Sequence, residues 1–311
     1  MKIIFMGTSL DSVCVLSKLI QLDIEISAVF TRLSKPSGRG MKVNNSPIKD
    51  YVDNTNIDLF QYNSLINNKE AYRKLKNISP DLIIVADFGL IIPIEILRLP
   101  PLGCLNIHPS LLPKYRGPSP VPFALLNEKK FTGVTIMLMD EGLDTGPIVT
   151  QKNVEFLCQE NAGSLTQRLF QLGASLISDI LFSWENGQIK AIPQNECNAT
   201  YTNKLSKEDG RIDWSHSAIE INKKILAYTP WPGAFTYWKG KRIKIIEAEL
   251  CHTSSRGNYS NGFVFQLDNK LHVMTGEGSL ILNKIQLEGK KIILVKEFIQ
   301  GYNDFTHAKL G

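Results

Sequence analysis

The sequence predicts an α/β fold in which a Rossmann-like domain with a parallel sheet precedes a small antiparallel β-barrel of the OB type. In the first half, short apolar runs alternate with helical patterns, which is the rhythm of parallel strands covered by helices. Residues 188–204 are polar and rich in turn formers. Alternating runs separated by Gly and Asn then indicate a small barrel or sandwich.

The first half is expected to alternate strand and helix. Short apolar runs bounded by turn residues predict buried strands, and apolar residues at helical spacing predict amphipathic helices. The expected strands cover 2–7, 24–31, 81–88, 102–108 and 133–140, and the expected helices cover 12–20, 48–52, 70–75 and 164–184.

The second half is expected to hold one helix, at 218–227, followed by short strands. These strands fall within 235–238, 242–250, 262–267, 270–276 and 279–287. We therefore divide the chain into an N-terminal domain (1–187), a linker (188–205) and a C-terminal β-barrel domain (206–311).

Composition predicts a soluble, cytoplasmic protein. The 311 residues are 43% hydrophobic and 21% charged, the chain does not open like a secretory leader, and no apolar run reaches the roughly eighteen residues that a membrane helix needs. The five cysteines are scattered, so we expect reduced thiols, no disulfide framework and no metal site. Because no long exposed apolar face stands out, we expect a monomer.

The turn after the first strand does not predict a dinucleotide site. Gly7 is followed by no second or third glycine and by no Lys-Ser/Thr pair, which excludes both the Rossmann fingerprint and a P-loop. A tight turn with Thr8 or Ser9 as the helix N-cap explains this stretch.

Three polar side chains are candidates for catalysis. Asn106 and His108 lie two residues apart at the end of an apolar strand, so they face the same side of the sheet. A second strand, 133–140, is expected to end nearby at the same rim of the sheet, and it leads into a Gly-rich turn that contains Asp144. An imidazole can move a proton, an amide can donate to an oxyanion, and a carboxylate can orient the imidazole. This set suits acyl transfer to an amine by direct attack.

Structural roles explain the same residues equally well at this point. A strand-end histidine can serve hydrogen bonding alone, and Asn and Asp are common turn residues. No nucleophile elbow surrounds Ser110, and Cys104 lies inside the apolar strand, where an inert thiol is expected.

The motifs around these residues resemble the folate-dependent formyltransferase family. The stretch from Asn106 to Pro113, the following Tyr115-Arg116-Gly117 and the segment TGVTIMLMDEGLDTGPI carry the resemblance. FMGTS, KPSGRGMKVNNSPIK, YTNKLSKEDGRIDWSHSA and AYTPWPGAFT extend it over nearly the whole chain, toward the members that act on initiator tRNA.

The resemblance implies formyl transfer from 10-formyltetrahydrofolate to the amine of methionine on initiator tRNA, without a metal. It places Asn106, His108 and Asp144 on the catalytic positions. Folate contacts are expected from Ser110, Leu111, Leu112, Pro113, Asp87 and Phe88. Asp87-Phe88 and the segment 118–122 depart from the family's usual residues, which puts the shape of the folate pocket in doubt.

Basic residues are candidates for binding the tRNA. The segment 32–49 has five basic and no acidic residues, and 206–311 holds 15 Lys and Arg against 11 Asp and Glu. The resemblance places Arg39 at the acceptor end. The expected tRNA contacts are Arg39, Lys42, Lys204, Lys207, Lys241 and Arg242, with Lys239 and Lys244 on the same surface. Trp238 and Tyr237 are expected in the barrel core, and Trp231 in interdomain packing.

Two other functions remain open on the sequence. A formyl-folate enzyme acting on a small amine, such as an amino sugar or glycinamide ribonucleotide, would share the catalytic residues. A non-catalytic RNA-binding protein would keep the fold and the basic surface without them.

Overall fold

A computed structural model describes residues 1–34, 36–37, 42–43, 45–251 and 259–311. These residues group into two compact units. The first comprises 1–120, 130–156 and 166–202, and the second comprises 121–129, 157–165 and 203–311. None of the described helices is long and apolar enough to cross a membrane.

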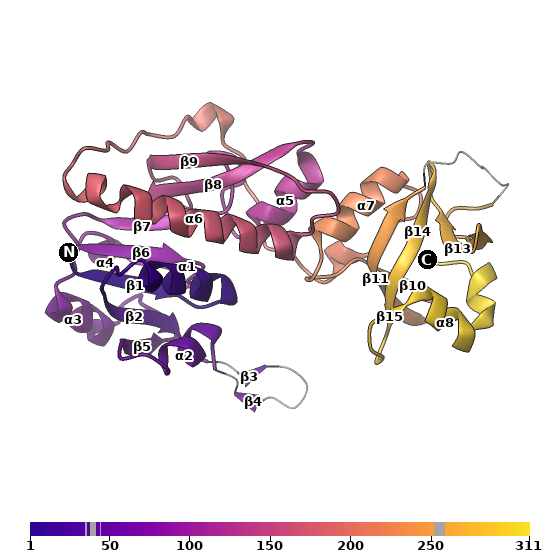
Figure 1. The fold of residues 1–311 in the computed structure, drawn as a ribbon, viewed down its shortest axis with the longest axis horizontal. Helices are drawn as coiled ribbons and strands as arrows, with labels where there is room; N and C mark the ends of the chain where they lie inside the picture. The colour runs from indigo at the N-terminus through magenta and orange to yellow at the C-terminus, as the bar shows by residue number, and fades with distance from the viewer. Residues whose placement is uncertain (35, 38–41, 44, 252–258) are drawn as a thin grey trace. The chain divides into compact units, whose positions relative to one another are not determined.

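The first unit is built on a seven-stranded sheet with the order β5-β2-β1-β6-β7-β8-β9 (Figure 1). The strands from β5 to β7 are parallel, whereas β8 runs antiparallel to β7, and β9 antiparallel to β8. The strand bounds are β1 Ile3–Gly7, β2 Ile26–Arg32, β5 Asp58–Tyr62, β6 Leu82–Ala86, β7 Cys104–His108, β8 Phe131–Leu138 and β9 Ile148–Glu155. Two short strands, β3 Pro36–Ser37 and β4 Lys42–Val43, pair separately.

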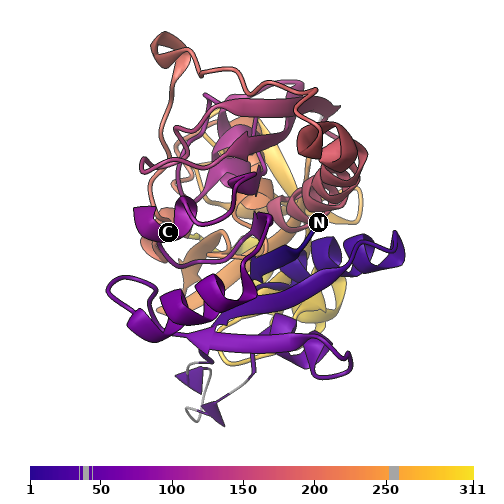
Figure 2. The ribbon, with the colours of Figure 1, turned by 90° about the vertical axis from the view of Figure 1, so that its left-hand side faces the viewer.

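Helices cover both faces of this sheet, as continuous apolar strands such as β1 and β6 require. The helices α1 and α6 lie on one side of the sheet and α3 on the other (Figure 2). The helix bounds are α1 Leu10–Gln21, α2 Pro47–Val52, α3 Lys69–Ile78, α4 Ile94–Leu97 and α6 Ala162–Glu185. The helix α5, Pro120–Asn127, falls almost entirely in the second unit. Ser9 caps α1 through a capping box with Ser12, which confirms the expected N-cap.

The second unit is an antiparallel half-barrel with the strand order β10-β11-β14-β13-β12, and β15 pairs with β14. Its bounds are β10 Phe235–Trp238, β11 Lys241–Leu250, β12 Val264–Leu267, β13 Lys270–Met274, β14 Ser279–Leu287 and β15 Ile293–Leu294. The helices are α7 Ala218–Ala227 and α8 Val295–Gly301, with 3-10 turns at Glu196–Asn198 in the first unit and at Glu208–Gly210 and Asn303–His307 in the second. Trp238 lies in its core against Phe298 and Phe305, as expected.

Cys14, Cys104, Cys158 and Cys197 are free thiols, as expected. Cys158 and Cys197 are exposed, and Cys104 is buried within β7. Burial raises the pKa of Cys104 to about 12. A thiol with so high a pKa is a poor nucleophile near neutral pH, in agreement with the inert role expected for this residue.

Candidate active site

The strand β7 presents Asn106 and His108 on one face of the sheet, at its carboxyl end. Cys104, two residues before Asn106, hydrogen-bonds the Leu97 carbonyl of α4, and this places the even-numbered residues of β7 on the α3–α4 face. Ile107 points the other way, toward Gly173 of α6. The prediction that Asn106 and His108 share one face of the sheet is therefore confirmed.

The imidazole of His108 is held by the backbone of the turn that follows β7. His108 is 4% exposed, and its Nε2 lies 3.0 Å from the Tyr115 carbonyl oxygen. Because a carbonyl oxygen only accepts, Nε2 carries the hydrogen in this arrangement. Nδ1 is therefore the ring nitrogen that can gain or lose a proton.

Asp144 comes from the loop between β8 and β9 and reaches the same place. Its Oδ2 lies 3.7 Å from His108 Nδ1, which is ion-pair range but too long for a hydrogen bond. The same oxygen accepts a 2.7 Å hydrogen bond from the Gly117 amide. Asp144 itself adopts a left-handed backbone conformation, with φ at 53°.

The structure shows that Asp144 reaches His108 by a different route from the one that the sequence predicts. The sequence predicts that the carboxyl end of the strand 133–140 lies at the same rim of the sheet as that of β7. Because β8 is antiparallel to β7, Leu138 instead pairs with Leu105 near the start of β7. Asp144 returns to His108 because the loop folds back before β9 begins, and not because two strands end together.

The side chain of Asn106 is half-buried and hydrogen-bonds no other side chain or backbone group among the described residues. Its backbone lies between Val85 of β6 and Met137 of β8 in the sheet. An amide that the protein leaves unpaired at a strand end can donate to an oxygen of a ligand. Asn106 therefore has the donor that the predicted chemistry needs.

A hydrogen-bond network centred on the buried side chain of Thr135 fixes the turn 110–113, and the sequence did not predict it. Thr135 of β8 donates its hydroxyl hydrogen to the Ser110 carbonyl at 2.6 Å and accepts from the Leu112 amide at 3.1 Å. Gln151 of β9 donates to the same hydroxyl at 2.8 Å and to the Leu112 carbonyl at 2.7 Å. The Ser110 hydroxyl donates to the Lys114 carbonyl. Leu111 lies beside Gly133, where a Cβ would meet its Cδ2 at 2.4 Å.

The other expected folate residues lie at the carboxyl end of β6. Phe88 is 3% exposed and packs in the core cluster on the α3–α4 face, and its carbonyl accepts from the Thr8 hydroxyl. Asp87 is exposed and has a positive φ of 44°. Of this pair, only Asp87 has its side chain in contact with solvent.

Asp11, at the start of α1, makes stability depend on pH. Burial, and then the charge of Asp87, raise its pKa to about 6. The folded state thus binds a proton that the unfolded state has released between the usual pKa of 3.8 and about 6, so stability falls as pH rises through this window. We expect Asp11→Asn to abolish this loss of stability. The free energy of unfolding near neutral pH should rise by about 1 kcal/mol, a figure reduced for the partial exposure of the Asp11 carboxyl.

Urea unfolding of wild type and Asp11→Asn at about pH 4 and about pH 7 measures this effect. The same change at the exposed Asp58 is the control, and we expect it to leave the pH dependence as it is. Equal pH dependence in wild type and Asp11→Asn would contradict the prediction.

The expected tRNA-binding residues are only partly described. Arg39 lies outside the described residues, and of Lys42 the structure gives the backbone, which pairs with Ser37. In the second unit Lys204, Lys207 and Lys241 are exposed. The guanidinium of Arg242 lies 5.4 Å from the centre of the Phe235 ring, and Lys239 forms an ion pair with Asp304. The pKa of Lys244 is lowered by burial and then by the nearby charges of Arg242 and Lys207.

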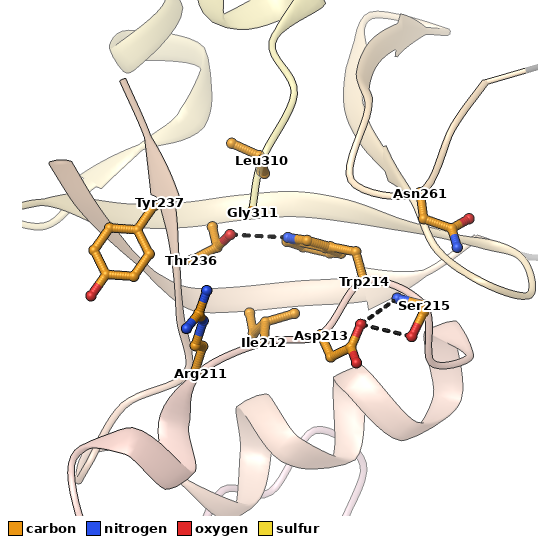
Figure 3. A pocket seen from close by; sticks show the side chains of 10 residues that line it. All are labelled: Arg211, Ile212, Asp213, Trp214, Ser215, Thr236, Tyr237, Asn261, Leu310 and Gly311. Carbon is orange, nitrogen blue, oxygen red and sulfur yellow. Dashed lines mark hydrogen bonds between the residues drawn. The ribbon is translucent and has the colours of Figure 1, made fainter. Parts of the chain in front are cut away.

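A pocket of about 490 Å³ lies in the second unit (Figure 3). Arg211 lines it, with its guanidinium 5.8 Å from the centre of the Tyr237 ring. Deeper in the wall, the Trp214 indole donates to the Thr236 hydroxyl at 3.0 Å. Tyr237 is half-buried rather than a core residue, and Trp231 is 51% exposed.

Comparisons with known proteins cover both parts of the chain. A family model described as formyl transferase matches residues 1–181, and one described as the formyl transferase C-terminal domain matches 204–303. The methionyl-tRNA formyltransferase of Alkaliphilus oremlandii is 42% identical over 306 residues, which cover 97% of this chain and 96% of that protein. The methionyl-tRNA formyltransferase of Caldanaerobacter subterraneus is 39% identical over 303 residues, 97% of each chain.

Solved structures show the same fold at lower identity. The sugar 3N-formyl transferase WlaRD, solved with dTDP and 5-N-formyl-THF, has a TM-score of 0.65 at 21% identity and covers 94% of this chain and 99% of that chain. HypX from Aquifex aeolicus, in complex with tetrahydrofolic acid, has a TM-score of 0.64 at 17% identity. The match covers 96% of this chain and 47% of HypX, so this chain spans about half the length of that protein.

Proposed function

The chain belongs to the formyl transferase family, and we propose that it transfers the formyl group of 10-formyltetrahydrofolate to the amine of methionine on initiator tRNA. The observation that carries this proposal is the identity of 39 to 42% to methionyl-tRNA formyltransferases over 97% of the chain. We assign catalysis to residues 1–187 and tRNA binding to 206–311, and we expect a cytoplasmic monomer.

In the proposed mechanism the neutral methionyl amine attacks the formyl carbon directly. Asn106 donates its amide hydrogen to the oxyanion that forms, and protonated His108 donates from Nδ1, since Nε2 is engaged by the Tyr115 carbonyl. At 3.7 Å, the Asp144 carboxylate is in ion-pair range of Nδ1 but beyond hydrogen-bond distance, so within the described part of the chain Nδ1 is available to the reacting atoms.

Collapse of the tetrahedral intermediate breaks the bond between the formyl carbon and the folate nitrogen. The departing nitrogen takes a proton, and the amine gives up the proton it carried as a nucleophile. Asp144, through water, supports this exchange, so no proton is gained or lost overall. The turn 110–113 and Asp87 are the residues that we propose hold the folate.

The test of the function is formylation itself. The purified protein is incubated with 10-formyltetrahydrofolate and methionyl initiator tRNA, and the mass of the released aminoacyl group is measured. We expect a gain of one formyl group on methionine. A parallel reaction with a dTDP-amino sugar and with glycinamide ribonucleotide separates the small-amine alternative, and formyl transfer to one of these but not to the tRNA would overturn the proposal.

We propose that the basic face of β10 and β11 follows the tRNA backbone. Tyr237 pairs with Arg242, and Phe235 with Lys244, so cationic and aromatic side chains share one face of this strand pair. Positive charges interleaved with aromatic rings suit phosphates and unpaired bases. Arg211 over Tyr237 extends this face into the pocket of Figure 3.

Loss of charge on this face is expected to weaken tRNA binding and its salt dependence. Arg242→Gln combined with Lys207→Gln, the two charges nearest Lys244, should lower the slope of log affinity against log salt by roughly 0.7 to 0.9 per lost phosphate contact. Filter binding of methionyl-tRNA between about 50 and 200 mM salt measures the slope. The matched control is Lys270→Gln with Lys296→Gln, two exposed lysines of the same unit. Equal slopes for the two double variants would refute the assignment.

A further inference from the structure

The turn after β7 carries a buried charge that the proposed mechanism does not use. The side chain of Arg116 is fully buried. Its Nε and Nη2 donate to Gln194 Oε1 at 3.0 and 2.9 Å, its Nη1 and Nη2 donate to the Glu196 carboxylate at 2.9 and 2.7 Å, and Nη1 also donates to the Tyr201 hydroxyl at 2.9 Å. Burying a guanidinium costs free energy unless such partners compensate it, and a buried ion pair is weak evidence for stability. We therefore look for another role for Arg116.

The orientation of the Gln194 amide indicates that role. Its oxygen faces the guanidinium, and its nitrogen therefore faces the opposite way. A flipped amide would set its hydrogens against the donors of Arg116, so the orientation is fixed. Gln194 Nε2 donates to the carbonyls of Asp144 at 2.9 Å and Gly146 at 2.7 Å.

The loop that carries Asp144 is thus held at two points. Gln194 holds its backbone, where Asp144 has the left-handed φ that residues other than glycine rarely adopt. The Gly117 amide holds its carboxylate. Gly117 follows Arg116, whose own backbone amide bonds the Thr200 carbonyl at 2.9 Å and whose carbonyl accepts from the Thr202 amide at 2.7 Å.

We propose that Arg116 and Gln194 are positioning residues that hold the carboxylate of Asp144 beside His108. The proposal rests on the catalytic role proposed for Asp144. It assigns a part in catalysis to the segment 194–202, beyond the end of the N-terminal domain that the sequence predicts at residue 187.

The test variant is Gln194→Glu. It keeps an oxygen for Arg116 but replaces the two donors to the Asp144 and Gly146 carbonyls with an acceptor that repels them. A misplacement of about 1 Å can cost on the order of a hundredfold in rate, so we expect the single-turnover rate of formyl transfer to fall at least about tenfold. The KM for methionyl-tRNA and the thermal midpoint should stay near wild type. Gln188→Glu, the same change at an exposed glutamine, is the control and should be as fast as wild type.

A double-mutant cycle shows whether Gln194 acts through Asp144. In an Asp144→Asn background the catalytic carboxylate is already lost, so adding Gln194→Glu should slow the reaction by less than about twofold. A purely structural role would lower the rate by the same factor in both backgrounds, which would overturn the proposal. Gln194→Met, which removes the donors without adding charge, repeats the cycle if Gln194→Glu lowers the thermal midpoint.

The outcomes separate this inference from the proposed function. A slow Asp144→Asn variant together with a fast Gln194→Glu variant overturns the positioning role and leaves the catalytic role intact. An Asp144→Asn variant with wild-type turnover overturns the catalytic role of Asp144, and the positioning role with it, while formylation of methionyl-tRNA by the wild type still stands.

Discussion

His108→Ala is expected to lower kcat for formyl transfer by about a hundredfold or more, because it removes both a proton donor and an oxyanion contact. The geometry assigns the catalytic role of the imidazole to its Nδ1 atom. Nε2 is engaged by the Tyr115 carbonyl, so Nδ1 is the only ring nitrogen free for the reacting atoms. Steady-state kinetics with methionyl-tRNA and 10-formyltetrahydrofolate measure kcat and both KM values.

Two further variants sharpen this prediction. Asn106→Ala removes the amide that hydrogen-bonds nothing else in the described structure, so it should slow the reaction without lowering the thermal midpoint. His216→Ala, at an exposed histidine of the second unit, is the control. Wild-type turnover in either His108→Ala or Asn106→Ala would exclude that residue from catalysis.

Thr135→Val is expected to destabilise the protein by about 2 to 4 kcal/mol and to raise the KM for 10-formyltetrahydrofolate. Its buried hydroxyl makes three hydrogen bonds, one as donor and two as acceptor, which is its full capacity. Valine has nearly the same shape, so the change leaves buried polar groups of Ser110 and Leu112 without a partner. Denaturant unfolding measures the stability, and folate titration of the reaction measures the KM.

The control is Thr135→Ser, which keeps the hydroxyl and loses one methyl group. We expect it to keep the KM for the folate substrate close to wild type and to cost about 1 kcal/mol in stability. If valine and serine had the same effect on KM, the hydroxyl would not be what fixes the turn 110–113.

The elements that the sequence predicts correctly are those whose own residues determine them. The strand β1 is buried along its whole length, and α7 carries both its apolar stripe and its Ser217 capping box locally. The strand β5 was missed because it lies at the edge of the sheet and buries only Tyr62 fully. The strand β9, also at an edge, was missed because it buries only Val154. The antiparallel direction of β8 follows from pairing, which no local pattern records.

The same distinction applies to the candidate site. Asn106 and His108 could be predicted because strand alternation alone puts them on one face. The grouping of Asp144 with His108 was predicted, although for the wrong geometric reason. Thr135, Gln151 and Gln194 were missed because each acts on a segment far away in the sequence, and a polar residue carries no local mark of its distant partner.

Cys197 gives this protein a native attachment point for a reporter dye. It is an exposed thiol that directly follows Glu196, whose carboxylate accepts hydrogen bonds from Arg116. Once Cys158, the other exposed thiol, is changed to serine, a maleimide fluorophore at Cys197 would sense movement of the chain next to the reaction centre without a new cysteine. A change in its fluorescence on addition of 10-formyltetrahydrofolate would report that this segment moves when the substrate binds.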